Sequence, residues 1–485
     1  MQVPARIGRG LVVVAGALLM LWPAVVNGYP LLYPDSMSYL GDGRPLARIL
    51  FLHAPKGYGA MRSEFYSLGI FPFHWNVTAW PIVVLQAVLT SYVLWLVVRS
   101  FAAHSSGARA FDSRRATVQF VLLVALLSLT TSLAWYVCFI MPDILGPLLY
   151  LAVYLLVFAH ETLSTREKCA VAVIAAWAMA AHSTHLMLAI GLWVLLDLLF
   201  VLRWPPLRER GRAIGSVVGI ILVVAAGQMA LHGYLYGKAT LLGNRMPYTM
   251  ARFVADGPGR WYLQAHCGTL DWAICARVHD LPNGALPDND DDFLWADGGV
   301  WAGATPEQQE QMLREEWPLV LATARAYPGA QVRVSLNNFG TELTNFGLWD
   351  FTPNPWMGSE IDKVLPGALP TYLRTREAQS RLPTDFFTAV QQWVVLASAL
   401  AIVVCVPLLW RRRRWRVLGL VTVLVPAVIA NAFLTAVFSE VDSRYQSRVV
   451  WLIPLLAGLI MLDLLEQRRQ RREATGLPGS AAALP

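Results

Sequence analysis

The sequence predicts an all-α polytopic membrane protein with about ten transmembrane helices, and three observations support this fold class. Of its 485 residues, 56% are hydrophobic and only 15% are charged, whereas an ordinary soluble domain carries about 25% charged residues. Apolar runs of the length that crosses ~30 Å of hydrocarbon recur along the chain. The 19 tryptophans suit a protein with many membrane–water interfaces.

The expected spans are the apolar runs at residues 10–28, 79–98, 117–136, 143–160, 169–181, 186–202, 213–235, 389–410, 417–438 and 449–465. The first run follows Arg6 and Arg9 and resembles a signal peptide. No small-x-small cleavage site follows it, and Trp22-Pro23 interrupts the place where one would sit, so we expect an uncleaved first span. The fifth and sixth runs are separated only by residues 182–185, and are either two spans or one bent element.

The distribution of basic residues favours two spans there. If both termini are cytoplasmic and the number of spans is even, every inside segment contains arginine or lysine, while the short outer turns 137–142 and 182–185 contain neither. Merging the fifth and sixth runs would place the arginines of 203–212 and 411–416 outside. We therefore expect a multi-pass protein of a bacterial inner membrane, with both termini in the cytoplasm.

This topology divides the chain into three parts. Residues 1–235 form a transmembrane module that includes a long first periplasmic loop at 28–78, residues 236–388 form a small α-rich periplasmic subdomain between spans seven and eight, and residues 389–485 contain the C-terminal spans and a basic tail. In the subdomain, Thr305-Pro-Glu-Gln308 is a capping box with proline at the first helical position. Tyr327-Pro328 ends that helix, and a second helix is expected over 330–346.

Two further features of the subdomain lead to expectations. Cys267 and Cys275 lie close together, and in an oxidising compartment we expect a disulfide between them, with two free thiols as the alternative. The acidic run at 288–292 lacks calcium-loop spacing and is expected in a solvated loop.

Polar residues gather at the outer ends of the spans. They are Asp35, Asp143, His182, His185 and the segment Glu440-Val-Asp-Ser-Arg-Tyr-Gln-Ser-Arg448. The interiors of the spans hold few ionisable residues, which argues against an ion-coupled transporter. A site on the outer face is the interpretation that these positions favour.

Each of these residues also has a structural interpretation. Asp35 and Asp143 could cap the helices that follow them. His182 and His185 could bind a phosphate or a metal, or make structural hydrogen bonds. Arg444 and Arg448 suit bidentate phosphate binding, or could pair with acidic neighbours in a solvated turn.

The overall plan resembles the GT-C superfamily of membrane glycosyltransferases that use polyprenyl-phosphate sugars. The branch of protein O-mannosyltransferases and aminoarabinose transferases is the most similar. The segments that carry the resemblance are Tyr33-Pro-Asp-Ser-Met-Ser-Tyr-Leu40, Met141-Pro-Asp-Ile-Leu145 and Asp442-Ser-Arg-Tyr445. The sequence departs from the family in its first loop, where Ser36 follows Asp35 in place of a second acidic residue.

The resemblance implies that Asp35 is the catalytic base and that Asp143 belongs to the catalytic centre. It implies an inverting transfer of a sugar from a lipid-linked donor to a glycan, lipid or protein acceptor, and leaves a divalent cation as an open requirement. Membrane lipids are the surrounding partners, and no nucleic acid is expected. The alternatives are a transporter or flippase of lipid-linked glycans, and a non-catalytic subunit of an envelope assembly. The expected substrate-binding residues are Arg444, Tyr445, Arg448, His182, His185, Lys56, Arg62 and Tyr39.

Overall fold

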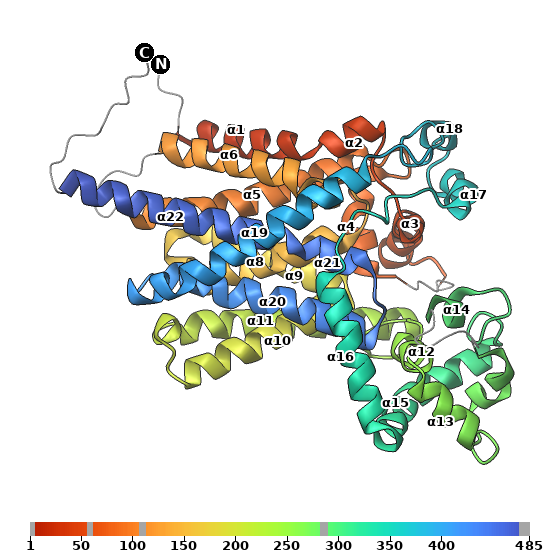
Figure 1. The fold of residues 1–485 in the computed structure, drawn as a ribbon. Helices are drawn as coiled ribbons and strands as arrows, with labels where there is room; N and C mark the ends of the chain where they lie inside the picture. The colour runs from red at the N-terminus through yellow and green to blue at the C-terminus, as the bar shows by residue number, and fades with distance from the viewer. Residues whose placement is uncertain (1–4, 56–61, 106–112, 282–289, 475–485) are drawn as a thin grey trace. The chain divides into compact units, whose positions relative to one another are not determined.

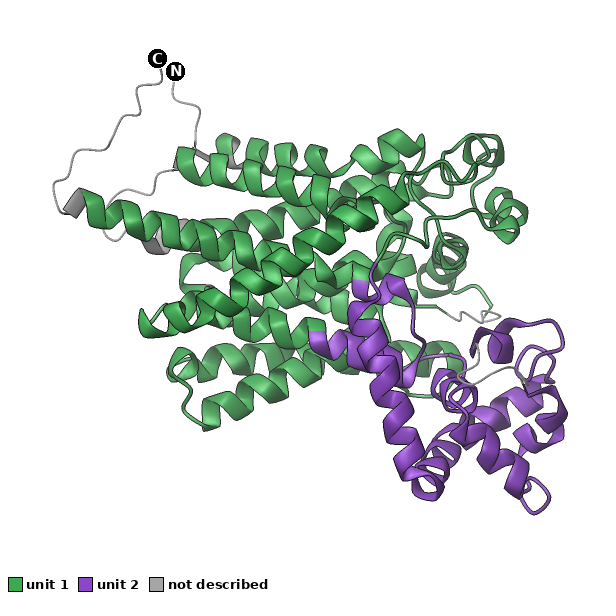
Figure 2. Ribbon diagram, viewed as in Figure 1, with its two compact units in different colours: residues 1–241, 347–428, 447–485 green, residues 242–346, 429–446 purple. Residues whose placement is uncertain are grey.

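The structure is a computed structural model that describes residues 5–55, 62–105, 113–281 and 290–474. The described residues are helical apart from turns, loops and an isolated parallel bridge between Leu31 and Phe139 (Figure 1). The chain divides into two compact units (Figure 2). Unit 1 contains residues 1–241, 347–428 and 447–485, and unit 2 contains residues 242–346 and 429–446.

Unit 1 is a bundle of long helices with short helices at their ends. Its elements are α1 (Ala5–Met20), α2 (Trp22–Asn27), α3 (Pro34–Leu52), α4 (Glu64–His74), α5 (Trp80–Ser105), α6 (Ser113–Thr130), α7 (Leu133–Val137), η1 (Pro142–Ile144), α8 (Leu145–Phe158), η2 (His160–Thr162), α9 (Thr165–Ala181), α10 (Ser183–Val201), η3 (Pro205–Leu207), α11 (Gly211–Tyr236), α17 (Pro355–Val364), α18 (Leu369–Tyr372), α19 (Thr384–Arg411) and α22 (Leu452–Ala474). Two further helices, α20 (Trp415–Phe438) and α21 (Ser443–Val450), have residues in both units.

In the described part of the chain, six helical segments are long and apolar enough to cross a membrane. They are Trp80–Phe101, Ser183–Val201, Gly211–Tyr236, Thr384–Arg411, Trp415–Phe438 and Ser443–Arg472. Each coincides with a predicted span, so the prediction of a helical membrane protein is confirmed at this level. Gly10–Met20 and Pro142–Phe158 are shorter apolar helices at two further predicted spans.

Local sequence explains where the helices of the first, fifth and sixth apolar runs end. The first run breaks after Met20, and α2 begins with Pro23 in its first turn, since proline cannot donate a backbone hydrogen bond to a continuing helix. The fifth and sixth runs form the separate helices α9 and α10, because His182 adopts extended backbone between them. The two runs are therefore separate helices, and the prediction that each spans the membrane remains a prediction.

Unit 2 is a small helical unit with its own apolar core. It contains α12 (Tyr248–Ala255), α13 (Pro258–His266), η4 (Ala273–Asp280), α14 (Asp290–Trp295), α15 (Pro306–Ala326) and α16 (Pro328–Thr344), with the end of α20. Met250, Leu263, Phe293, Met312 and Leu319 are buried in this core. The predicted capping box at the start of α15 is confirmed, as is the break between α15 and α16 at Tyr327 and Pro328.

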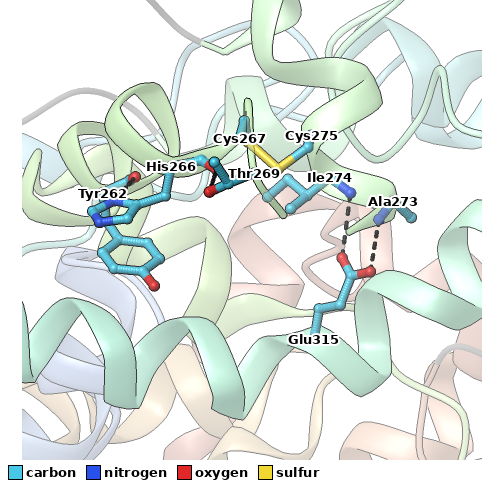
Figure 3. Close-up of a disulfide and its surroundings, with 8 residues drawn as sticks. All are labelled: Tyr262, His266, Cys267, Thr269, Ala273, Ile274, Cys275 and Glu315. Carbon is cyan, nitrogen blue, oxygen red and sulfur yellow. Dashed lines mark hydrogen bonds between the residues drawn. A yellow bond between two sulfur atoms is a disulfide. The ribbon is translucent and has the colours of Figure 1, made fainter. Parts of the chain in front are cut away.

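The Cys267–Cys275 disulfide lies against the core of unit 2 (Figure 3). Beside it, the Glu315 carboxylate accepts backbone hydrogen bonds from Ala273 (2.6 Å) and Ile274 (3.2 Å) (Figure 3). The disulfide at Cys275 and this buried carboxylate thus fix the start of η4.

The units divide the chain differently from the three predicted parts. Residues 347–388, which the sequence groups with the periplasmic subdomain, belong to unit 1, and residues 429–446, grouped with the last spans, belong to unit 2. Tertiary hydrogen bonds tie the first stretch to other parts of unit 1, because the Ser447 hydroxyl donates to the Gly347 carbonyl (2.8 Å) and the Leu32 N–H donates to the Glu377 carboxylate (3.2 Å).

Candidate functional site

In unit 1, hydrogen bonds hold the first resemblance segment, residues 33–40, and the residue Leu31 before it against residues 138–140, which precede the second segment at 141–145. The Leu31 N–H donates to the Cys138 carbonyl (2.9 Å), and the Ile140 N–H donates to the Leu31 carbonyl (3.0 Å). The Ser36 hydroxyl donates to the Ile140 carbonyl (2.9 Å). The start of α3, which carries Asp35, is therefore held against the turn that leads to Asp143.

Asp35 lies in the first turn of α3, directly after Pro34. Its carboxylate accepts a hydrogen bond from the Arg62 guanidinium at 2.5 Å, and the two side chains are 17% and 18% exposed. Asp35 is not the cap of the helix, because Tyr33 occupies the N-cap position and its N–H donates to the Ser36 hydroxyl at 2.9 Å. A carboxylate near the positive end of a helix, held by an arginine and still accessible, can accept a proton from a bound hydroxyl group.

Asp143 lies in η1, immediately before α8, and pairs with Arg448 of α21 at 3.5 Å. Both side chains are almost fully buried, at 3% and 1% exposed. A buried ion pair requires that each charge keep its partner, since either one alone would lose its hydration without compensation. Asp143 thus holds the Arg448 side chain in place by an ion pair. Because the Asp143 carboxylate is buried, we do not expect it to exchange a proton directly with a substrate.

The two histidines lie at the start of α10 and have different environments. The His182 ring accepts a hydrogen bond from the Thr184 N–H (3.2 Å), which makes it the cap of α10. His185 is buried, and its Nδ1 contacts the Ala178 carbonyl at 2.9 Å. Its Nε2 has no hydrogen-bond partner among the described residues, and a Cβ on Gly146 would lie 2.8 Å from it. Glycine at 146 is therefore needed for His185 to occupy this position.

Tyr39 is buried, and its ring packs edge-on against Tyr66 at a centroid distance of 4.9 Å. The Tyr66 hydroxyl donates to Gln86 (2.9 Å), whose amide in turn donates to the Val137 and Phe139 carbonyls (2.9 Å each). Tyr39 thus supports the packing between α3, α4 and the 137–144 segment. Lys56, another predicted substrate-binding residue, lies outside the described residues.

Arg444 and Tyr445 belong to unit 2. The Arg444 guanidinium donates to the Tyr445 hydroxyl (3.2 Å), which donates to Glu440 (3.1 Å), and the Arg444 N–H donates to the Asp442 carboxylate (2.9 Å). Burial raises the pKa of Glu440 well above its usual range, and the carboxylate of Asp442 adds to this effect. Arg444 thus has acidic neighbours in Glu440 and Asp442, as the structural interpretation of this turn expects.

The same turn is buried, which the interpretation as a solvated turn did not anticipate. Arg444 and Arg448 are 5% and 1% exposed, and Arg448 pairs with Asp143 of unit 1. The two arginines lie on α21 one helical turn apart, yet the Arg444 guanidinium donates to the Tyr445 hydroxyl while that of Arg448 pairs with the Asp143 carboxylate. Of the predicted residues, Asp35, Arg62, Tyr39, Asp143, His182, His185 and Arg448 belong to unit 1.

Two further buried carboxylates in unit 1 adjoin the predicted residues and were not singled out from sequence. Glu64, in the first turn of α4, accepts from the Tyr236 hydroxyl at 2.5 Å and lies 3.4 Å from the His232 ring of α11. Glu377 accepts from the Leu32 N–H at 3.2 Å, and burial raises its pKa to about 8. Glu64 could have been noticed in the sequence, because it is an acidic residue directly before an apolar stretch. Glu377 is surrounded by polar residues in the sequence, so nothing there indicated that it is buried.

The expectation that the acidic run at 288–292 lies in a solvated loop is wrong for Asp290, which is buried at the start of α14. Asp290 is buried and pairs with Arg252 at 3.0 Å, while Arg252 also pairs with Asp256 at 2.9 Å. Burial raises the pKa of Asp290 to about 6. Asp290 is thus part of the interior of unit 2, where the Arg252 guanidinium of α12 offsets its negative charge.

No group of three or more His, Cys, Asp or Glu side chains is placed to hold a metal ion within the described ranges. Comparisons with protein-family models, curated proteins and solved structures found no match to this chain. The candidate site consists of a partly exposed ion pair between Asp35 of α3 and Arg62, which precedes α4. The start of α3 is held against the segment of Asp143, which forms a buried pair with Arg448.

Proposed function

We propose that this chain is a bacterial inner-membrane glycosyltransferase with ten spans and a periplasmic active site. It moves a sugar from a polyprenyl-phosphate carrier to a periplasmic glycan, lipid or protein. The observation that carries the proposal is the contrast between the two aspartates. Asp35 is accessible and held by Arg62, whereas Asp143 is buried with Arg448.

In the proposed reaction, Asp35 accepts the proton of the acceptor hydroxyl group. The acceptor oxygen forms a bond to the anomeric carbon, while the bond from that carbon to the phosphate oxygen breaks, with inversion. The polyprenyl phosphate leaves with the bonding electron pair. A general base of this kind contributes about 10²–10⁴-fold to the rate.

Guanidinium groups support the departure of the phosphate in this scheme. Arg62 is the partly exposed cation beside Asp35 and can bind the developing negative charge by charge-assisted hydrogen bonds. Arg444 is assigned to the donor phosphate on the family resemblance. Asp143 is a positioning residue, because its contact is to Arg448 and its side chain is buried.

The test compares Asp35→Asn with Asp42→Asn, a matched change on the same helix α3. Membrane vesicles containing each variant are given a radiolabelled polyprenyl-phosphate hexose or pentose, and release of polyprenyl phosphate is measured with transfer of label. We expect Asp35→Asn to lose at least about 100-fold of the transfer rate and Asp42→Asn to retain it. Equal transfer by the two variants would contradict the assignment of Asp35.

Measuring movement of the labelled donor across the membrane in the same vesicles separates the alternatives. A flippase would move the donor without cleaving its sugar–phosphate bond, so cleavage would stay at background in wild type and in Asp35→Asn. A non-catalytic assembly subunit would show neither movement nor cleavage.

A further inference from the structure

The helix α16 of unit 2 buries polar residues and exposes apolar ones. Gln331, Asn338 and Glu342 recur at helical spacing and are 5%, 6% and 0% exposed. On the neighbouring stripe, one residue further along, Val332 and Leu336 are 58% and 59% exposed. A water-facing helix has the reverse arrangement, with its apolar stripe against the core.

Each residue of the buried polar stripe makes a hydrogen bond inside unit 2. Asn338 and Gln331 donate to the Asp256 carboxylate at 2.8 and 3.5 Å, and Glu342 accepts from the Asp442 N–H at 3.0 Å. These bonds fix the rotation of α16 about its axis. The polar contacts of the buried stripe therefore keep Val332 and Leu336 on the outside. Turning the helix to bury these two side chains would break those hydrogen bonds and leave buried carboxylates without partners.

The apolar stripe is continuous with a helix that can span the membrane. Phe339, one turn beyond Leu336 on the same stripe, packs against Phe433 of α20 with ring centroids 5.9 Å apart. Phe433 and Ile429 are themselves 42% and 43% exposed on α20, which is long and apolar enough to cross a bilayer. Within unit 2, α16 runs across the end of α20 rather than alongside it (Figure 2).

Polar residues of α16 are exposed beside this apolar stripe. Arg333 and Asn337 follow the apolar stripe by one residue each and are exposed. A helix that exposes an apolar stripe beside a polar one, and that crosses a membrane-spanning helix near its end, has the distribution of an interfacial helix. The preceding helix α15 also exposes Trp317 and Leu321, one turn apart, and tryptophan is enriched at membrane–water interfaces.

We infer that α16 is a lipid-binding surface, with Val332 and Leu336 inserted at the boundary between the headgroups and acyl chains of the bilayer that α20 crosses. The occupant of this face is phospholipid. This inference does not depend on the proposed transferase reaction, since it concerns only the environment of the helix.

The test uses the full-length protein in bilayers of phosphatidylethanolamine and phosphatidylglycerol. Cys169 and Cys405 are first replaced by alanine, while Cys138 is buried and Cys267 and Cys275 form the disulfide. A nitroxide label is then placed singly through Val332→Cys and Leu336→Cys, with Arg333→Cys and Asn337→Cys as matched controls on the same helix. Collision rates with oxygen, which concentrates in lipid, and with a water-soluble nickel chelate are measured by electron paramagnetic resonance.

We expect labels at 332 and 336 to collide more often with oxygen than with the nickel chelate, and labels at 333 and 337 to show the reverse order. Nickel accessibility at 336 equal to that at 337 would place the stripe in water and overturn the inference. Shielding of 332 and 336 from both reagents would also overturn it, because a protein surface would then cover the stripe.

Discussion

The Asp143–Arg448 ion pair allows a quantitative test of the unit 1 site. Arg448→Met removes the positive charge and keeps most of the apolar length of the side chain. With the charged atoms 3.5 Å apart and an effective dielectric constant of about 20, Coulomb's law gives an attraction of about 5 kcal/mol. Both groups are almost fully buried, so solvent screening does not reduce this value much. Removal of one partner of a buried pair costs about 3–5 kcal/mol.

We therefore expect Arg448→Met to lower the free energy of unfolding by about 3–5 kcal/mol. The measurement is reversible unfolding of the purified protein in lipid bicelles. The double variant Asp143→Asn with Arg448→Met is the matched control, because it removes the carboxylate that the single variant leaves unpaired. It should recover most of the loss, since neutral groups can replace a buried pair at little cost.

Two results would refute this reasoning. A loss below about 1 kcal/mol in Arg448→Met would be the value of an exposed pair and would mean that water reaches the two groups. Failure of Asp143→Asn to recover stability would mean that Arg448 acts through contacts other than Asp143.

Three further predictions concern separate parts of the chain. Burial raises the pKa of Glu377 from 4.5 to about 8, so its contribution to stability is complete below about pH 4.5 and is lost as the pH rises through about 8. Glu377→Gln should flatten the pH dependence of the unfolding midpoint in this range, and an unchanged pH dependence would contradict the prediction. Reduction of the Cys267–Cys275 disulfide, whose cysteines are 8 residues apart, should cost about 2.5 kcal/mol, and Cys267 should resist alkylation until a reductant is added; labelling without reductant would count against the bond. Arg444→Ala should raise the KM for the lipid-phosphate donor roughly tenfold or more with a smaller change in kcat, and an unchanged KM would remove Arg444 from donor binding.

The membrane-spanning helices and several helix boundaries could be predicted from local sequence. An apolar run of sufficient length has few stable alternatives in a bilayer, because its backbone must satisfy its own hydrogen bonds there. The start of α15 at Pro306 and its end before Pro328 follow from Thr305, Gln308 and the missing proline N–H, all within a few residues. Where local signals conflicted, as at Pro23, the length of the apolar run alone was a poor guide to the helix end.

The sequence predicted several residues of the candidate site but not which of them contact one another. Asp35 and Arg62 were both identified, yet their contact depends on how α3 packs beside the segment before α4. Arg444 and Arg448 are one helical turn apart and chemically identical, and sequence assigned them one role. Their partners differ because Arg448 meets Asp143, 305 residues away, while Arg444 remains beside Asp442 and Tyr445.

By itself, the sequence determined that this is a helical membrane protein, where its apolar helices lie, and which polar residues occur beside their ends. Only the tertiary structure decided which of those residues are accessible and which are buried as pairs, and that α16 exposes Leu336 while it buries Glu342. The physical reason is that helix formation and membrane insertion depend on consecutive residues, whereas burial and ion pairing depend on segments that meet only after the chain has packed.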